Sequence, residues 1–130
     1  MAEVRELRVT LTVDDFDAAL AFYRDTLGLE QLADWSGDDG RVVLLGAAAG
    51  RLELFDERQA ESVDRIEVGR RVAGKVRLAF EVDDSGELAE RLATAGGEVI
   101  TGPVETPWGD RNVRLTSPDG TQLTLFTPGG

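Results

Sequence analysis

Apolar and polar residues alternate along residues 7–13, and the same alternation returns along residues 76–82. A period of two places one kind of side chain on each face of a strand, so both segments are predicted to be β-strands with one apolar face. We expect the apolar faces to pack against helices. The polar faces carry Arg8, Thr10 and Thr12 in the first strand and Arg77, Ala79 and Glu81 in the second.

A helix is predicted after each of these strands. The pairs Asp14-Asp15 and Asp83-Asp84 supply side chains that can cap a helix N-terminus, with Ser85 as an alternative cap in the second case. Glycines at 28 and at 96–97 are suited to end the two helices. Apolar residues at helical spacing lie between these signals: Phe16, Leu20, Tyr23 and Leu27, then Leu88, Leu92 and Ala95.

Shorter apolar stretches separated by turn residues follow each helix. Residues 29–35 mix apolar and polar positions, and Ser117-Pro118-Asp119-Gly120 has the composition of a turn. Residues 102–109 are expected to form a long loop. Further strands are predicted at 41–45, 51–55, 98–100, 111–115 and 122–126.

The two halves of the chain repeat one order of elements. Arg8 and Arg77 lie 69 residues apart, as do Gly28 and Gly97, while Leu52-Glu53-Leu54-Phe55 returns as Leu123-Thr124-Leu125-Phe126. The sequence therefore predicts an α+β fold in which two βαβββ modules form a concave, partly open, barrel-like sheet with helices outside. We expect one domain over residues 1–130, with modules at about 5–56 and 75–128. The charged segment 57–74 is predicted to be a linker with one helical turn at most.

Composition narrows the classes of function. The chain has a net charge of −11, which argues against nucleic acid because no excess of cations would neutralise phosphates. It has no His and no Cys, so imidazole and thiolate chemistry is excluded and a cytoplasmic location is expected. We also expect no signal peptide and no membrane span.

The polar faces of the strands indicate a ligand site. The same positions are polar in both modules, and they mix charged groups with aromatic rings, as concave binding sites do. An open solvated sheet face and a dimer interface are the alternatives. The residues predicted to share this face include Arg8, Glu53, Phe55, Arg77, Asn112, Arg114, Thr124 and Phe126.

Taken together, these motifs resemble the vicinal oxygen chelate superfamily, which includes glyoxalase I, extradiol dioxygenases and bleomycin-resistance proteins. The resemblance covers nearly the whole chain. It is carried by residues 9–30 with Leu20-Ala21-Phe22-Tyr23-Arg24-Asp25 inside them, by residues 52–55 and 78–82, by Pro107-Trp108-Gly109 and by residues 117–120. It implies four equivalent strand positions that hold metal ligands in the family's enzymes.

Those four positions here hold Arg8, Glu53, Arg77 and Thr124. Only Glu53 suits a divalent cation, and two permanently charged guanidiniums would repel one. A catalytic metal site usually needs about three protein ligands. We therefore expect no metal and no other cofactor. Two roles stay open for the charged groups: a network that replaces the metal, or donation from Arg8 or Arg77 to a ligand oxygen.

Trp35 and Trp108 are the only tryptophans, and both fall outside the predicted helices. Either could fill the core, but in drug-binding members of the family aromatic groups in comparable loops stack on planar ligands. We expect Trp35, Phe55 and Trp108 to contact a ligand, with Arg8, Glu53, Arg77, Arg114 and Thr124 orienting it. The resemblance also implies a homodimer with clefts shared between chains.

The sequence thus favours a metal-independent protein that captures a small organic molecule, aromatic or polycyclic, as in antibiotic sequestration. The alternative is a lyase, isomerase or oxygenase acting on a small organic substrate, either with metal ligands elsewhere or with Glu53 as a base. A scaffold without a ligand is a third alternative. No catalytic residue is assigned.

Overall fold

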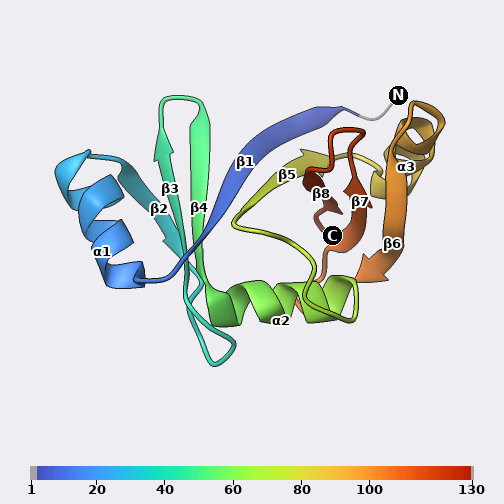
Figure 1. Ribbon diagram of the computed structural model, residues 1–130. Helices are drawn as coiled ribbons and strands as arrows, with labels where there is room; N and C mark the ends of the chain where they lie inside the picture. The colour runs from blue at the N-terminus through green and yellow to red at the C-terminus, as the bar shows by residue number, and fades with distance from the viewer. Residues whose placement is uncertain (1–2, 130) are drawn as a thin grey trace.

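The computed structural model describes residues 3–129 and contains one curved sheet of eight strands (Figure 1). The strands are β1 (Val4–Val13), β2 (Glu30–Asp34), β3 (Val42–Ala47), β4 (Gly50–Asp56), β5 (Val76–Val82), β6 (Glu98–Glu105), β7 (Arg111–Thr116) and β8 (Gln122–Thr127). Their order across the sheet is β2-β3-β4-β1-β5-β8-β7-β6. Residues 1–2 and 130 of the predicted domain lie outside the described residues.

The sheet is made of two equivalent halves joined at its centre. β1 pairs with β4 in parallel, and β5 pairs with β8 in parallel, so each half has the same topology. β1 and β5 then pair with each other in antiparallel fashion, with Thr10 opposite Arg77 and Arg8 opposite Ala79. The predicted pair of βαβββ modules is confirmed, and the modules pair within a single chain.

One helix covers the outer face of each module. In module one, α1 (Phe16–Leu20) continues as the π-helical segment η1 (Ala21–Thr26), and in module two the helix is α3 (Ser85–Thr94). Asp15 and Asp84 cap them, each accepting a backbone N–H at 3.0 Å, which confirms the predicted caps. Gly28 adopts φ +91°, a left-handed conformation suited to the predicted helix end.

Two hydrophobic clusters anchor these helices to the sheet. Phe16 and Leu20 pack against Leu45 and Leu54, which have no exposed surface. Burial of each of these leucines stabilises the fold by about 1.5–3 kcal/mol. The equivalent cluster of module two comprises Val82, Ala89, Val113, Leu115 and Leu125. The concave face is therefore left to polar and aromatic side chains.

A third helix occupies the segment that was expected to be a linker. α2 (Glu57–Glu67) has three turns and begins after Asp56, whose Oδ1 accepts the Gln59 N–H at 2.8 Å. It runs from the end of β4 towards module two, below the strands in the view of Figure 1. The prediction of at most one helical turn was wrong, because the buried face of α2 carries acidic residues as well as apolar ones.

Two smaller predictions also differ from the structure. β6 was expected to end at Ile100 but continues to Glu105, with its register shifted around Gly102-Pro103. A proline is tolerated there because β6 is the last strand of the sheet. Leu7 was expected to face a helix but is 48% exposed, because the α1 cluster reaches only Leu11 and Val13 of β1.

Among the described residues, the longest helices are too short and too polar to cross a membrane.

Candidate functional site

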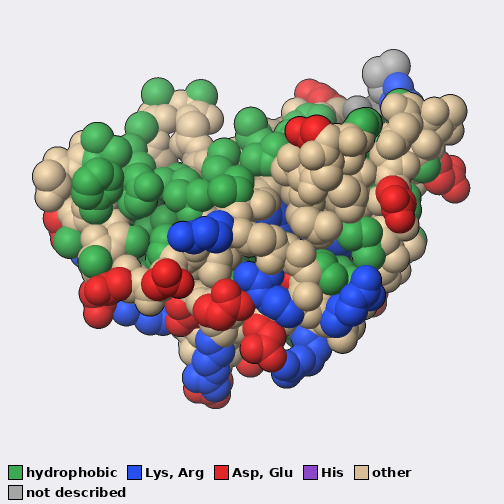
Figure 2. Space-filling view, in the orientation of Figure 1, with side chains coloured by type: hydrophobic (Ala, Val, Ile, Leu, Met, Phe, Trp, Pro, Cys, Tyr) green, Lys and Arg blue, Asp and Glu red, His purple; other side chains and the backbone are tan. Residues whose placement is uncertain are grey.

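A cleft of about 590 Å³ opens on the concave face of the sheet, within the size range of small-molecule sites. Its walls come from β1, β3 and β4 of module one, from β5, β7 and β8 of module two, and from α2. Charged side chains gather along the lower side of the molecule, where α2 runs, whereas hydrophobic side chains gather over module one (Figure 2). The predicted concave site therefore corresponds to a cleft lined by both modules of one chain.

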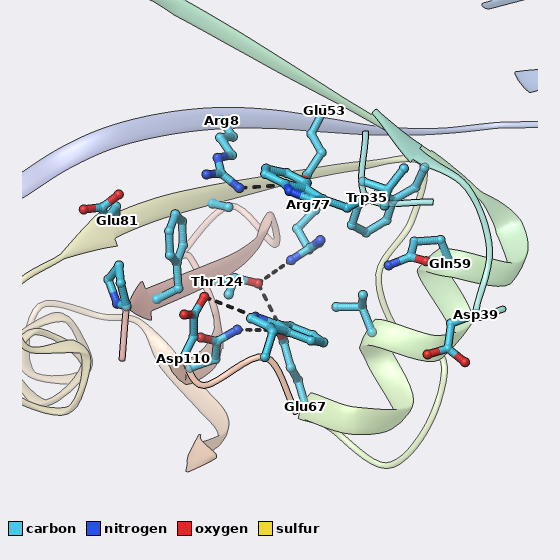
Figure 3. A pocket seen from close by; sticks show the side chains of 18 of the residues that line it. Arg8, Trp35, Asp39, Glu53, Gln59, Glu67, Arg77, Glu81, Asp110 and Thr124 are labelled. Carbon is cyan, nitrogen blue, oxygen red and sulfur yellow. Dashed lines mark hydrogen bonds and ion pairs between the residues drawn. The ribbon is translucent and has the colours of Figure 1, made fainter. Parts of the chain in front are cut away.

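In module one, the charged centre of the cleft is an ion pair between Arg8 and Glu53 (Figure 3). Arg8 Nη1 lies 3.6 Å from Glu53 Oε2, and the Thr10 hydroxyl donates to Glu53 Oε1 at 2.9 Å. Thr10 is opposite Glu53 in the β1–β4 register, which places the two side chains on the same face. Arg8 Nε also binds Glu6 at 2.6 Å. Both oxygens of Glu53 therefore already face protein donors.

In module two, Arg77 has different partners. It is 6% exposed, and its Nη1 donates to the Thr124 hydroxyl at 2.5 Å. No carboxylate of the described residues lies within 4.0 Å of its guanidinium. The expected network in which Glu53 joins both arginines is thus only half present, because Arg77 turns to Thr124 instead.

The two arginines stack on phenylalanines of the opposite module. Arg8 lies over the Phe126 ring at 4.9 Å, and Arg77 lies over the Phe55 ring at 5.3 Å. Phe55 and Phe126 occupy equivalent positions of the repeat, so the arrangement is symmetric about the β1–β5 junction. Such cation–π contacts hold the guanidiniums in place and connect the modules across the cleft.

Burial lowers the pKa of Arg77 from its usual value, while the nearby charges of Glu67 and Glu53 act in the opposite direction. The guanidinium nevertheless stays protonated at any working pH. The cleft therefore contains a fixed positive charge whose loss of hydration is only partly compensated by the protein.

Beneath Arg77 and Thr124 lies a layer of buried polar contacts supplied by α2. Glu67 Oε1 accepts from Arg114 Nη2 at 2.7 Å, and Glu67 Oε2 accepts from the Asn112 side chain at 2.7 Å. Arg114 is fully buried and also binds Asp64 Oδ1 at 2.9 Å. The structure thus places Arg114 behind Glu67 and Thr124 rather than in the cleft wall.

Asp64 connects α2 to the chain that follows it. Its Oδ2 accepts the backbone N–H groups of Val72 and Ala73 at 2.7 and 2.8 Å, and also Arg71 Nη1 at 2.9 Å. Burial alone would raise the pKa of Asp64, but these backbone hydrogen bonds and the charge of Arg114 outweigh it and hold the pKa below its usual value. Asp64 therefore stays ionised. It holds Arg114 and the backbone of Val72 and Ala73 in place beneath the floor of the cleft, which Glu67 and Asn112 form.

The two tryptophans line the cleft and are half exposed, Trp35 at 50% and Trp108 at 52%. Trp35 packs on the Arg8 guanidinium at 5.4 Å. Trp108 Nε1 donates to Asp110 Oδ2 at 3.1 Å, which restrains the indole. Neither ring belongs to the hydrophobic clusters of the fold. Each therefore presents apolar surface to the cleft.

Seven of the eight residues predicted for the site line the cleft, all except Arg114: Arg8, Trp35, Glu53, Phe55, Arg77, Trp108 and Thr124. Sequence reasoning missed the contribution of α2, which lines the cleft with Gln59, Val63 and Glu67. The spacing of Ala60, Val63, Asp64 and Glu67 was a helical signal, but the acidic members resembled a solvent-exposed face.

The residues at the four family positions do not fit a divalent metal ion. Glu53 is the one carboxylate among them, and Arg8 and Thr10 already bind it. No group of three His, Cys, Asp or Glu side chains among residues 3–129 is arranged to hold a metal.

We therefore expect calorimetric titrations with Ni, Zn, Mn and Fe(II) to give no stoichiometric binding at this place. Substitution Glu53→Ala tests the location, and Glu61→Ala on the exposed side of α2 is the control. A stoichiometric signal that disappears in Glu53→Ala but survives in Glu61→Ala would show that the site chelates after all.

Comparison with known proteins adds the family context. A family model described as the Glyoxalase/Bleomycin resistance protein/Dioxygenase superfamily matches residues 7–125. A lactoylglutathione lyase of Neisseria meningitidis is 30% identical over 106 residues, which is 78% of this chain and 75% of that protein. A candidate glyoxylase of Mycobacterium tuberculosis is 29% identical over 120 residues, 91% of this chain. The match spans 42% of that longer protein.

Among solved structures, a methylmalonyl-CoA epimerase of Streptomyces coelicolor is similar with a TM-score of 0.67. Its sequence is 22% identical, and the match covers 98% of this chain and 100% of the epimerase chain. At that identity the likeness concerns the fold. It agrees with the eight-stranded curved sheet built from two modules.

Proposed function

Because the chain belongs to the glyoxalase/bleomycin resistance protein/dioxygenase superfamily, we propose that its cleft binds one small planar organic molecule per chain without a metal ion. The observation that carries this proposal is the replacement of the family's metal positions by two guanidiniums stacked on phenylalanines, beside two half-exposed indoles. These groups suit recognition of a planar molecule by stacking and hydrogen bonding.

The contacts of the charged groups support the proposal of capture rather than turnover. Both oxygens of Glu53 face donors, Thr10 and Arg8, so its carboxylate is held as a neighbour of Arg8 rather than as a free base. Glu67 is likewise engaged by Arg114 and Asn112. Sequestration of an antibiotic is the biological role that such a site would serve. A homodimer is part of the same proposal.

The test is a thermal-shift screen with bleomycin, a tetracycline, a quinolone, riboflavin and simple aromatic acids and amines. A ligand present at 100 times its Kd should stabilise the protein by about 2.7 kcal/mol. We expect saturable stabilisation by at least one compound and a calorimetric stoichiometry of one per chain. Absence of any saturable shift across the screen would contradict the proposed function and favour a scaffold.

An enzyme is the second candidate, and the names of the relatives favour it: one is a lactoylglutathione lyase and another a methylmalonyl-CoA epimerase. Here Glu53 would act as a base on a substrate whose developing negative charge Arg77 stabilises. The observation to make is the fate of a bound compound. Conversion that is lost in Glu53→Gln would favour this candidate over capture.

A further inference from the structure

Arg77 differs from Arg8 and Arg114, the two other arginines whose contacts lie in or behind the cleft. Arg114, which has no exposed surface, binds the carboxylates of Asp64 and Glu67. Arg8 binds those of Glu6 and Glu53. Arg77 is nearly as buried as Arg114, yet its one hydrogen bond to the described residues goes to a neutral hydroxyl. Arg8 and Arg114 are thus each compensated by two carboxylates, and Arg77 is the exception.

The carboxylates nearest to Arg77 are committed elsewhere. Glu53 and Glu67 favour its charged state through space, but neither approaches the guanidinium within 4.0 Å. Glu53 is held by Thr10 and Arg8, and Glu67 is held by Arg114 and Asn112. A rearrangement that paired either one with Arg77 would break those contacts. The described residues therefore offer Arg77 no direct ion-pair partner.

A guanidinium has five N–H donors in a planar fork that matches a carboxylate. Arg77 uses one donor on Thr124, and it lines the cleft with its guanidinium carbon 5.3 Å from the centre of the Phe55 ring. A buried charge without a partner is costly, and a ligand carboxylate would relieve that cost. We propose that Arg77 is the anchor for a carboxylate of the bound molecule. This inference rests on the proposed binding function and names the class of its ligand.

The cleft also contains carboxylates that could bind a cationic group at the end of the ligand remote from Arg77. Asp38, Asp39, Glu81 and Asp110 line the same cleft, and none has an Arg or Lys of the described residues within ion-pair distance. In Figure 3, Glu81, Asp39 and Asp110 lie on different sides of Arg77. A cationic group on the ligand would meet these carboxylates. The ligand is therefore an amphoteric aromatic acid, with its carboxylate inward and its cation outward.

An amphoteric ligand would suit both the negative net charge of the chain and the positive charges in its cleft. The net charge of −11 favours a cationic ligand, whereas the arginines of the cleft favour an anionic one. A molecule that carries both charges at opposite ends of a planar ring satisfies each of them in a different place.

The test uses a rigid naphthalene series in calorimetric titrations. The amphoteric probe is 6-(aminomethyl)-2-naphthoate, and its primary amide and 6-methyl-2-naphthoate each lack one of its two charges. We expect the amphoteric probe to bind about tenfold or more tightly than the amide. Its advantage over 6-methyl-2-naphthoate should shrink as salt is raised, because the peripheral carboxylates are partly exposed.

Three variants identify the anchor: Arg77→Met, Arg77→Lys and Arg8→Met. In each variant we compare the affinity for the amphoteric probe with the affinity for its amide, and this ratio is independent of changes in overall affinity. We expect Arg77→Met to reduce the ratio to about one. Arg77→Lys, which keeps the charge but loses the fork, should give an intermediate ratio, and it serves if the methionine variant does not fold. Arg8→Met should keep the wild-type ratio.

Equal or tighter binding of the amide by the wild-type protein would overturn the inference. A ratio that survives Arg77→Met would also overturn it, and its collapse in Arg8→Met would identify Arg8 as the anchor instead. Binding of a purely cationic or uncharged compound from the screen, with no binding of either naphthoate, would overturn it too. In all of these cases the binding function stands. If no compound of either set binds, the proposed function itself fails.

Discussion

Substitution Asp64→Ala should lower the free energy of unfolding by about 3–5 kcal/mol, because it leaves a buried cation with an incomplete set of partners. Arg114 would keep Glu67 but lose Asp64, and the N–H groups of Val72 and Ala73 would lose their acceptor. Urea denaturation of the variant and the parent protein measures the difference.

The matched control is Glu61→Ala on the same helix. Glu61 forms an exposed ion pair with Arg65 four residues on, and such pairs contribute about 0.5 kcal/mol or less. A loss in Asp64→Ala no greater than that in Glu61→Ala would show that the contacts beneath the cleft are not stabilising.

The pH dependence of stability provides a second measure of the same residue. The folded state holds the pKa of Asp64 below its usual value of 3.8. Its contribution is therefore present above the unfolded pKa and is lost as the pH falls through the lower folded pKa. The parent protein should lose stability below about pH 4, and Asp64→Ala should lose less over the same interval. Parallel pH profiles would contradict this role.

The double substitution Trp35→Ala, Trp108→Ala should weaken binding of a planar ligand about 100-fold without unfolding the protein. Each indole should contribute about tenfold through stacking and buried area, and the two effects should add if the rings contact the ligand independently. Both rings are half exposed and lie outside the hydrophobic clusters, so the melting temperature without ligand should change little. Calorimetry with the strongest ligand of the screen measures the loss.

The control for the indoles is Phe22→Ala. Phe22 is 63% exposed on η1 and does not line the cleft. It contacts Tyr23 edge to face at a ring distance of 5.1 Å, so the substitution also removes an aromatic contact. Ligand affinity should be unchanged in this variant. If the double tryptophan variant bound the ligand as tightly as the parent protein, the ligand would not contact the two indoles.

The fold was predictable because the sequence signals that specify each module are local and occur twice. Alternation in β1 and β5, aspartate caps and the glycine after each helix identify a module, and a constant offset identifies its copy. The same offset placed Arg8 and Arg77 at equivalent positions. Their stacking on Phe126 and Phe55 then follows from the pairing of the modules.

The floor of the cleft was not predictable in the same way. Asp64 and Glu67 are buried only because Arg114 and Asn112, more than 40 residues later, neutralise or bind them. Taken alone, an acidic residue on a helix indicates a solvent-exposed face. Arg114 was correctly placed on the concave side of β7, but α2 covers it and removes it from the cleft wall. Long-range charge pairing has no local sequence pattern.

In the function proposed above, the cleft captures a molecule and leaves it unchanged. The most direct test incubates the strongest ligand of the screen with a hundredth of its molar amount of protein. The ligand is then recovered for mass spectrometry and chiral chromatography, since an isomerase would not alter mass. We predict a complex of one ligand per chain and a free ligand identical in mass and configuration. Accumulation of a product, isomer or fragment in molar excess over the protein would contradict capture and identify an enzyme.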